Sequence, residues 1–213
     1  ASGVENCFVP VDAVTRINVK LIHGEETEIN ASGPQITEEN VCALEQIISA
    51  LDKGDVLVLS GAVPSSLPKD IYYRLGKAGK EKGVPIAVDT SGEALIKTLP
   101  LQPFLIKPNQ YELSELLHMP VTSPQEAKLA ALRLCEMGAR NVLCSMGKMG
   151  AVFVGEKHAP LFCRAPEGLL IHSVGAGDSM LAGFLAGFLQ TGNKTEAFLE
   201  SVAAGSATAY SPW

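Results

Sequence analysis

The segment Asp55-Val56-Leu57-Val58-Leu59-Ser60 decides the fold class, because it is an almost unbroken apolar run between polar ends. A strand with one wet face alternates polar and apolar residues, whereas a continuous apolar run is typical of a strand buried on both faces of a parallel sheet. Similar runs recur along the chain, and segments with helical periodicity separate them. Strands and helices in alternation predict an α/β fold with a mostly parallel central sheet.

Outward from this strand, the sequence predicts helices and strands in turn from residue 34 to the end. Thr37 has N-cap chemistry and introduces a helix with one apolar face. The other helices are expected near 68–82, 92–99, 110–117, 124–137, 177–190 and 194–209. The other strands are expected at 85–89, 104–106 and 141–145, with a hairpin near 150–163.

The first part of the chain has a different pattern. Residues 15–22 alternate polar and apolar side chains, a turn is expected at 23–26, and a return strand follows at 27–30. A two-stranded ribbon is rarely stable alone, so we expect it to lie over a second ribbon, another subunit or a ligand. We therefore divide the chain into a β segment, 1–33, and an α/β core, 34–213.

Composition excludes several classes of protein. A net charge of −6 over 213 residues argues against binding to nucleic acid or to an anionic membrane. The five cysteines include no Cys-x-x-Cys pair, which favours free thiols in a reducing compartment over a disulfide scaffold. The apolar stretch 180–189 is too short for a membrane span, which needs about 20 residues. We expect a cytoplasmic protein.

Polar residues gather where the predicted strands end. Ser60, Asp89, Lys107, Asn109 and Ser145 each lie at or just after such an end. In α/β sheets, ligands bind outside the carboxyl ends of the strands. These five residues therefore predict one ligand site.

A glycine turn near the end of the chain adds the chemistry. Gly175-Ala176-Gly177 precedes a helix expected to begin near Asp178, and a helix N-terminus offers unpaired N–H groups to an anion. The alternative is that Asp178 is only an N-cap. Glycines at 183 and 187, however, indicate that another backbone packs closely against this helix and fixes its position. The turn matches neither the Rossmann nor the Walker A pattern. A carboxylate beside N–H donors suits phosphoryl transfer to a hydroxyl, with Asp178 as base.

Five segments in this order resemble the ribokinase/PfkB family of sugar kinases, over nearly the whole chain. The resemblance is to the branch that phosphorylates sugar phosphates. It implies a three-layer α/β/α fold with a β-ribbon lid, and ATP and Mg²⁺ as cofactors. The segments are Thr15-Arg16-Ile17-Asn18-Val19-Lys20-Leu21, Ser60-Gly61 with Pro64, Lys107-Pro108-Asn109-Gln110-Tyr111-Glu112-Leu113, Ser145-Met146-Gly147-Lys148-Met149-Gly150 and Val174-Gly175-Ala176-Gly177-Asp178-Ser179-Met180.

The resemblance implies a nucleotide site. Gly175, Ala176 and Gly177 would form the anion hole beside Asp178. The loop 145–150 would bind the ATP phosphates, although a plain hairpin turn also explains it. Its implied contacts are Ser145, Met146, Gly147, Lys148, Met149 and Gly150. Lys107 is either a phosphate contact or a solvated lysine. Gly205 lies in a helix rich in small residues, which would either form a flat surface against the adenine or only pack against another helix.

Metal and acceptor contacts follow in the same way. Asn109 and Glu112 would organise Mg²⁺, but their spacing also fits a capping box. Asp89 is a further metal candidate or a turn residue. On the ribbon, Arg16 and Asn18 would bind the phosphate that the acceptor already carries, unless they only line an exposed strand. Ser60 would assist, although the family usually has a second serine where this chain has Ala62.

Within the family, the segment 15–21 most resembles the enzymes that phosphorylate fructose 1-phosphate, and this resemblance implies fructose 1-phosphate as acceptor and fructose 1,6-bisphosphate as product. Tagatose 6-phosphate and fructose 6-phosphate are alternatives within the family, and an unphosphorylated sugar or nucleoside is a third. A non-catalytic nucleotide or sugar-phosphate binding module is the alternative from another class. The family normally has a longer N-terminal part with more of the sugar site, and its lid implies a homodimer.

Overall fold

The computed structural model describes residues 3–23, 25–31, 33–156 and 158–212, with the backbone alone for 20–23, 25–28 and 30. Its centre is a six-stranded sheet in the order β3-β4-β5-β6-β7-β8. The strands are β3 (Leu57–Ser60), β4 (Ile86–Asp89), β5 (Leu105–Ile106), β6 (Asn141–Ser145), β7 (Ala151–Gly155) and β8 (Leu161–Cys163). The pairs from β3 to β6 are parallel and those from β6 to β8 antiparallel, so the expectation of a mostly parallel α/β sheet is confirmed.

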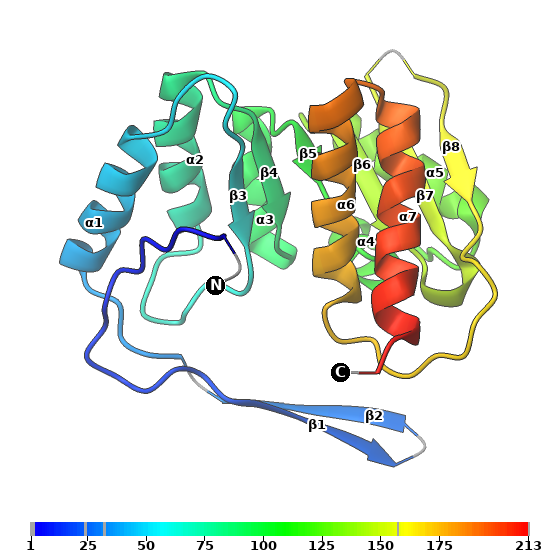
Figure 1. The fold of residues 1–213 in the computed structure, drawn as a ribbon, viewed down its shortest axis with the longest axis horizontal. Helices are drawn as coiled ribbons and strands as arrows, with labels where there is room; N and C mark the ends of the chain where they lie inside the picture. The colour runs from blue at the N-terminus through cyan, green and yellow to red at the C-terminus, as the bar shows by residue number, and fades with distance from the viewer. Residues whose placement is uncertain (1–2, 24, 32, 157, 213) are drawn as a thin grey trace.

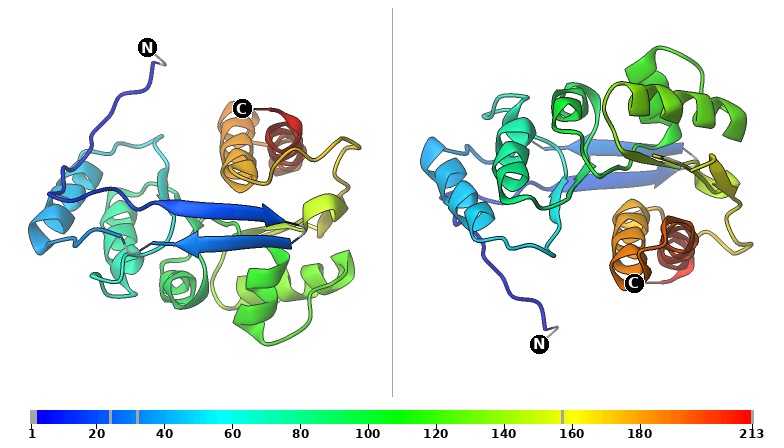
Figure 2. Two further views of the ribbon diagram at one scale, coloured as in Figure 1. Left: turned by 90° about the horizontal axis from the view of Figure 1, so that it is seen from below. Right: turned by 90° about the horizontal axis from the view of Figure 1, so that it is seen from above.

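Helices cover both faces of this sheet, which gives the expected three layers (Figures 1 and 2). Crossovers between parallel strands are almost always right-handed, and the order from β3 to β6 runs in one direction, so the helices that connect these strands fall on one face. That face carries α1 (Glu38–Ser49), α2 (Ile71–Lys82), α3 (Gly92–Thr98), α4 (Gln110–Leu117) and α5 (Pro124–Glu136). The last two helices, α6 (Ala176–Thr191) and α7 (Lys194–Tyr210), pack together on the other face.

Each face has its own apolar core. On the face of α1–α5, Val88 and Ile106 of the sheet meet Leu113 and Leu134 of the helices. On the other face, Leu105, Leu143 and Phe153 meet α6 and α7. Successive strand residues point to opposite faces, so strands buried on both sides must be apolar throughout, as the sequence suggested.

Several helices begin where the sequence predicts. Thr37, Asn109 and Ser123 cap α1, α4 and α5, each in a reciprocal capping box with the residue three positions on. The helix α6 is the exception, because it begins at Ala176 with Gly175 as its N-cap. Asp178 therefore lies in the first turn of the helix, so its interpretation as the N-cap is wrong.

The ribbon consists of β1 (Asn18–His23) and β2 (Glu25–Asn30), paired antiparallel. It lies below the body in Figure 1, at the edge of the sheet where β3 ends. The strands are longer toward the tip than expected, since His23 and Glu25 pair with each other; Gly24 lies outside the described residues. The first strand also starts later than expected, at Asn18.

No helix in the described part of the chain has the length and apolar character needed to cross a membrane.

Candidate active site

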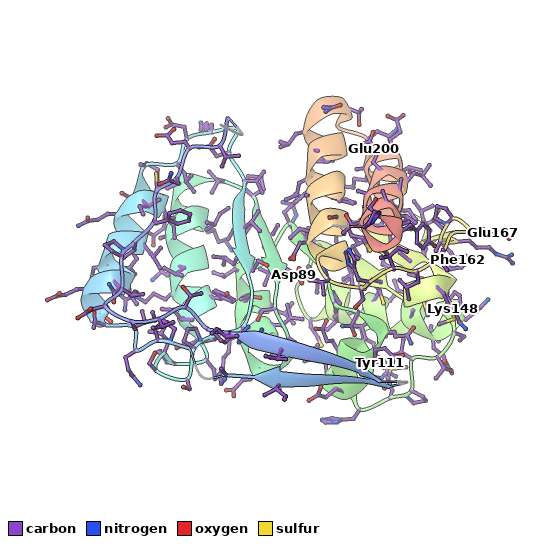
Figure 3. All side chains as sticks on the ribbon, turned by 60° about the horizontal axis from the view of Figure 1, so that its bottom comes forward. Asp89, Tyr111, Lys148, Phe162, Glu167 and Glu200 are labelled. Carbon is purple, nitrogen blue, oxygen red and sulfur yellow. The ribbon has the colours of Figure 1, made fainter. Side chains whose placement is uncertain are left out.

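The ends of the parallel strands bring the polar residues together, as predicted. Ser60 and Asp89 form the last rung between β3 and β4. A single bridge then joins Asn109 to Ser145 beyond β5 and β6, where the Ser145 N–H donates to the Pro108 carbonyl. Figure 3 shows this edge, with Asp89 at the boundary between the two halves of the molecule.

Lys107 and Asp89 form an ion pair at the centre of this edge. The Lys107 Nζ lies 3.1 Å from Asp89 Oδ1, and the two side chains are 7% and 17% exposed. The interpretation of Lys107 as a solvated strand-end lysine is therefore wrong; its contact with phosphate stays a prediction. A Cβ built on Gly177 would lie only 3.0 Å from Lys107 Nζ, so the ammonium group lies against the first turn of α6.

Two charges act on Asp89. Burial raises the pKa of the Asp89 carboxyl above its ordinary value, Lys107 opposes that rise, and the charge of Asp178 adds to it. The acidic group in the α6 turn is thus close enough to affect the end of β4. Loss of the Lys107 charge would leave two carboxylates facing each other in a partly dry site.

The N-terminus of α6 forms the other side of the site. Gly175 has a φ of +77°, a conformation that glycine adopts without steric cost, and this turns the chain into the helix. The Ala176 N–H donates to the Ser173 carbonyl, whereas Gly177 and Asp178 lie in the first turn, where a helix offers no acceptor to their N–H groups. The Asp178 side chain is exposed at this turn. An exposed carboxylate and two N–H groups without a helical acceptor therefore lie side by side.

Close packing of α7 holds this turn in place. A Cβ on Gly183 would lie 2.8 Å from Ala204 Cβ, and one on Gly205 would lie 3.0 Å from the Ala176 carbonyl oxygen. Gly205 is buried against α6, so helix packing accounts for it, and its contact with adenine stays a prediction. The Thr208 hydroxyl donates a 2.7 Å hydrogen bond to Ser179 Oγ, directly after Asp178.

The loop 145–150 closes the hairpin between β6 and β7. The Met146 N–H donates to the Gly150 carbonyl, and Gly147 has a φ of +54° with open space around the position that a Cβ would take. The Met146 side chain is 2% exposed and belongs to the core, so only its backbone can face a ligand. Gly150 is fixed by the backbone at the end of β8, which passes directly beside it. Lys148 is exposed (Figure 3).

Asn109 and Glu112 do form a capping box. Asn109 Oδ1 accepts hydrogen bonds from the N–H groups of Tyr111 and Glu112, and Glu112 Oε2 accepts one from Asn109 N–H at 2.8 Å. Burial raises the pKa of the Glu112 carboxyl, against the Asn109 N–H and the charge of Lys107. Within the described ranges no group of three or more His, Cys, Asp or Glu side chains could hold a metal ion.

The turn after β3 is held by residues that the sequence did not single out. The Tyr72 hydroxyl donates to the Ser60 carbonyl at 2.7 Å and to the Gly61 carbonyl at 3.2 Å. Thr90 donates to the Gly61 carbonyl at 2.9 Å. These hydrogen bonds join side chains to backbone groups far away in the sequence, so no local sequence pattern predicts them.

Arg16 and Asn18 are both exposed. Asn18 is the first residue of β1, whereas Arg16 precedes that strand, so the expectation that Arg16 lies in a strand is wrong. A cavity of about 290 Å³ beside Arg140 and Glu156 lies at the opposite edge, where β6 begins, away from the residues described above.

Comparison with known proteins gives consistent relatives. Residues 1–212 match the model of the pfkB family of carbohydrate kinases. A 1-phosphofructokinase of Bacillus subtilis is 45% identical over 98% of this chain and 69% of its own length. A D-tagatose-1-phosphate kinase of Bacillus licheniformis is 33% identical over 96% of this chain and 67% of its own length.

Solved structures of sugar and sugar-phosphate kinases are similar to this chain as well. The phosphofructokinase-2 of Escherichia coli in complex with fructose-6-phosphate has a TM-score of 0.79 at 31% identity, over 87% of this chain and 61% of that one. An Arabidopsis thaliana ribokinase complexed with ribose and ATP has a TM-score of 0.70 at 21% identity, over 89% of this chain and 61% of that one, which shows the shared fold. The chain spans about two thirds of the length of the curated relatives it matches.

Proposed function

This chain belongs to the pfkB family of carbohydrate kinases, and from that premise we propose that it transfers the γ-phosphoryl group of ATP to a hydroxyl of a sugar phosphate. The observation that carries the proposal is the first turn of α6. There an exposed carboxylate, Asp178, lies beside the N–H groups of Gly177 and of Asp178 itself, with the buried ammonium of Lys107 against Gly177. A base, anion-binding donors and a cation are what this transfer requires.

The roles follow from these positions. Asp178 accepts the proton of the attacking hydroxyl, and a positioned base contributes about 10²–10⁴ in rate. The N–H groups of Gly177 and Asp178, with Lys107, stabilise charge on the phosphoryl oxygens, whereas the Ala176 N–H already donates to the Ser173 carbonyl. Electrostatic donors of this kind contribute roughly 10²–10³ each when they are fixed in advance. Packing of α6 on α7 provides that fixation, because a Cβ at Gly183 or Gly205 would overlap atoms of the facing helix.

On the nucleotide side, the loop 145–150 is proposed to bind the phosphates through the open backbone at Gly147, with Ser145 as a hydroxyl donor. Mg²⁺ on a nucleotide needs only one or two protein carboxylates beside the phosphates and water. The carboxylates of Glu112 and Asp89 and the side-chain amide of Asn109 lie at the same edge of the sheet. They are proposed to hold the ion. When bound, the ion would neutralise charge on the phosphates.

Fructose 1-phosphate is the proposed acceptor, because relatives named 1-phosphofructokinase are 45% and 39% identical to this chain. Tagatose 1-phosphate is a second candidate, favoured by the relative of Bacillus licheniformis. Arg16, Asn18 and Ser60 are the proposed contacts to the sugar phosphate. A neutral sugar would give the Arg16 guanidinium nothing to pair with.

A homodimer through the ribbon is proposed as well. Val19 pairs with Ile29 across the two strands, and both side chains are exposed, at 43% and 55%. Ile17 continues the same face and is 64% exposed. An apolar ribbon face of this kind is stable when a second copy covers it. Sedimentation equilibrium of the protein and of an Ile17→Asp, Val19→Asp variant tests it: the wild type should be a dimer and the variant a monomer.

The direct test is a coupled assay of ADP release with ATP, Mg²⁺ and each sugar phosphate in turn, with the product identified by ³¹P NMR. Fructose 1-phosphate should show the highest kcat/KM. Asp178→Asn should lower kcat by about 10²–10⁴ with an unchanged melting temperature. Near-normal kcat in this variant would exclude the base, and ATP binding without transfer to any acceptor would indicate a binding module instead.

A further inference from the structure

The turn Ser60-Gly61 is tied to the rest of the molecule by two side chains from other elements. Tyr72, on α2, donates to both carbonyls of the turn, at 2.7 and 3.2 Å. Thr90, directly after β4, donates to the Gly61 carbonyl at 2.9 Å. From the opposite direction, the Gly61 N–H donates to the Asp89 carbonyl at 3.0 Å. Hydrogen bonds therefore hold both carbonyl groups of the turn and the N–H group of Gly61.

The turn would have little to hold it otherwise. Ser60 and Gly61 are both exposed, so apolar packing does not fix them. Gly61 has a φ of +98°, a conformation that few residues other than glycine adopt. The position of an exposed glycine turn is set by its hydrogen bonds, and here these come from the Tyr72 and Thr90 hydroxyls and from the Asp89 carbonyl.

Both anchors are themselves well placed. Tyr72 is half-buried and packs against the apolar core on the face of α1–α5. Burial, with the negative charge of Asp89, raises the pKa of the Tyr72 phenol, so the hydroxyl remains a donor at neutral pH. Thr90 follows Asp89, whose carboxylate holds Lys107. Through Thr90 and Asp89, the Ser60-Gly61 turn is thus connected to Lys107, whose ammonium group lies against the first turn of α6.

We propose that Tyr72 and Thr90 are positioning residues for the acceptor: they set the place of the Ser60-Gly61 turn and thereby the affinity for the sugar phosphate. This inference rests on the proposed function, in which Ser60 contacts that substrate. In-line attack needs reacting atoms about 3–3.5 Å apart, so a small shift of the acceptor wall affects both binding and rate. The nucleotide lies on the other side of the site, and its affinity does not depend on this turn.

Three variants test the inference against one matched control. Tyr72→Phe removes one anchor and keeps the ring, and Thr90→Val removes the other and keeps the shape. Thr90→Ser restores the hydroxyl. Tyr73→Phe is the control, because Tyr73 is the next residue of α2 and lies in the groove between α1 and α2. The readouts are kcat, the KM for fructose 1-phosphate, the KM for ATP, and the melting temperature.

Tyr72→Phe and Thr90→Val should each raise the KM for the sugar phosphate about threefold to tenfold, the effect expected when one hydroxyl donor is lost. The KM for ATP should stay unchanged in both. Thr90→Ser and Tyr73→Phe should match the wild type. A general loss of stability would instead change both KM values together and would not be rescued by serine.

The opposite results separate the two proposals. An unchanged sugar-phosphate KM in both variants, or an equal rise in both KM values, would overturn the role of Tyr72 and Thr90 and leave the kinase function standing. A wild-type protein that transfers phosphate to no sugar phosphate would overturn the kinase function, and with it this inference.

Discussion

The ammonium group of Lys107 lies 3.1 Å from a carboxylate oxygen of Asp89, and the two side chains are almost entirely removed from solvent. The pair joins the end of β4 to the segment after β5, directly beside the first turn of α6. A buried ion pair contributes little net stability over an apolar pair, but loss of one partner leaves an uncompensated charge. Its value here is position, because it places a cation beside the turn that carries Asp178.

Lys107→Met should therefore lower the free energy of unfolding by roughly 3 kcal/mol, since Asp89 would stay buried without its counter-charge. Asp89→Asn added to Lys107→Met should recover part of that loss. Urea unfolding of both single variants and the double variant measures the coupling. Strictly additive losses would contradict a direct interaction. Activity should stay low in the double variant, because its cation is gone.

Gly177→Ala should separate activity from stability. Its Cβ would lie 3.0 Å from Lys107 Nζ and displace the ammonium, while the backbone there tolerates alanine. We expect kcat to fall by up to about tenfold, because an electrostatic donor is displaced. The free energy of unfolding should be unchanged or raised by up to about 1 kcal/mol. Steady-state kinetics and urea unfolding of the same preparation measure the two effects.

Gly183→Ala is the matched contrast on the same helix. Its Cβ would lie 2.8 Å from Ala204 Cβ and 3.1 Å from the Glu200 carbonyl oxygen, so the helices must move apart. This variant should lose melting temperature first. If Gly177→Ala lost stability in the same way, the contact with Lys107 would not be the reason for the glycine.

Thr208→Val should lower kcat a few-fold, because it removes the 2.7 Å hydrogen bond to Ser179 that ties the α6 turn to the end of α7. Thr208→Ser should keep near-normal turnover. Ser179→Ala should have the same effect as Thr208→Val, and the double variant no more than either. Losses of kcat that multiply in the double variant would show that the two hydroxyls act separately.

Cys144 should make stability depend on pH in alkaline solution. Burial raises the pKa of its thiol to about 12, with the charge of Glu112 adding to the rise. The unfolded chain ionises this thiol near 9.0, so unfolding is favoured progressively as the pH rises from 9 toward 12. At pH 10 the loss should be roughly 1 kcal/mol relative to pH 8.

A Cys144→Ala variant should show a smaller loss between pH 8 and pH 10 in urea titrations. Alkylation gives an independent check, because exposed Cys42 should react with iodoacetamide at pH 8 while Cys144 stays protected. Equal rates of alkylation at the two positions would contradict the burial of Cys144.

Local patterns predicted most of the fold. Capping residues and apolar periodicity act within one turn or one strand, so the caps Thr37 and Asn109 follow directly from neighbouring residues. The predicted start of α6, near residue 177 or 178, is one to two residues late, because a glycine N-cap has no side chain to mark it. β1 also begins later than predicted, for a different reason. The alternation of polar and apolar residues continues through Arg16, but the start of the strand depends on its pairing with β2, and this pairing begins at Asn18.

The sequence by itself determined the order of strands and helices, the edge at which a site would form, and the glycine turn with its carboxylate, since all of these depend on neighbouring residues. Only the tertiary structure decided what those residues contact. It buried Lys107 on Asp89, packed Gly205 against α6 and brought Tyr72 and Thr90 to the Ser60-Gly61 turn. Such contacts join residues far apart in the chain, and they depend on how the layers pack, which no local pattern records.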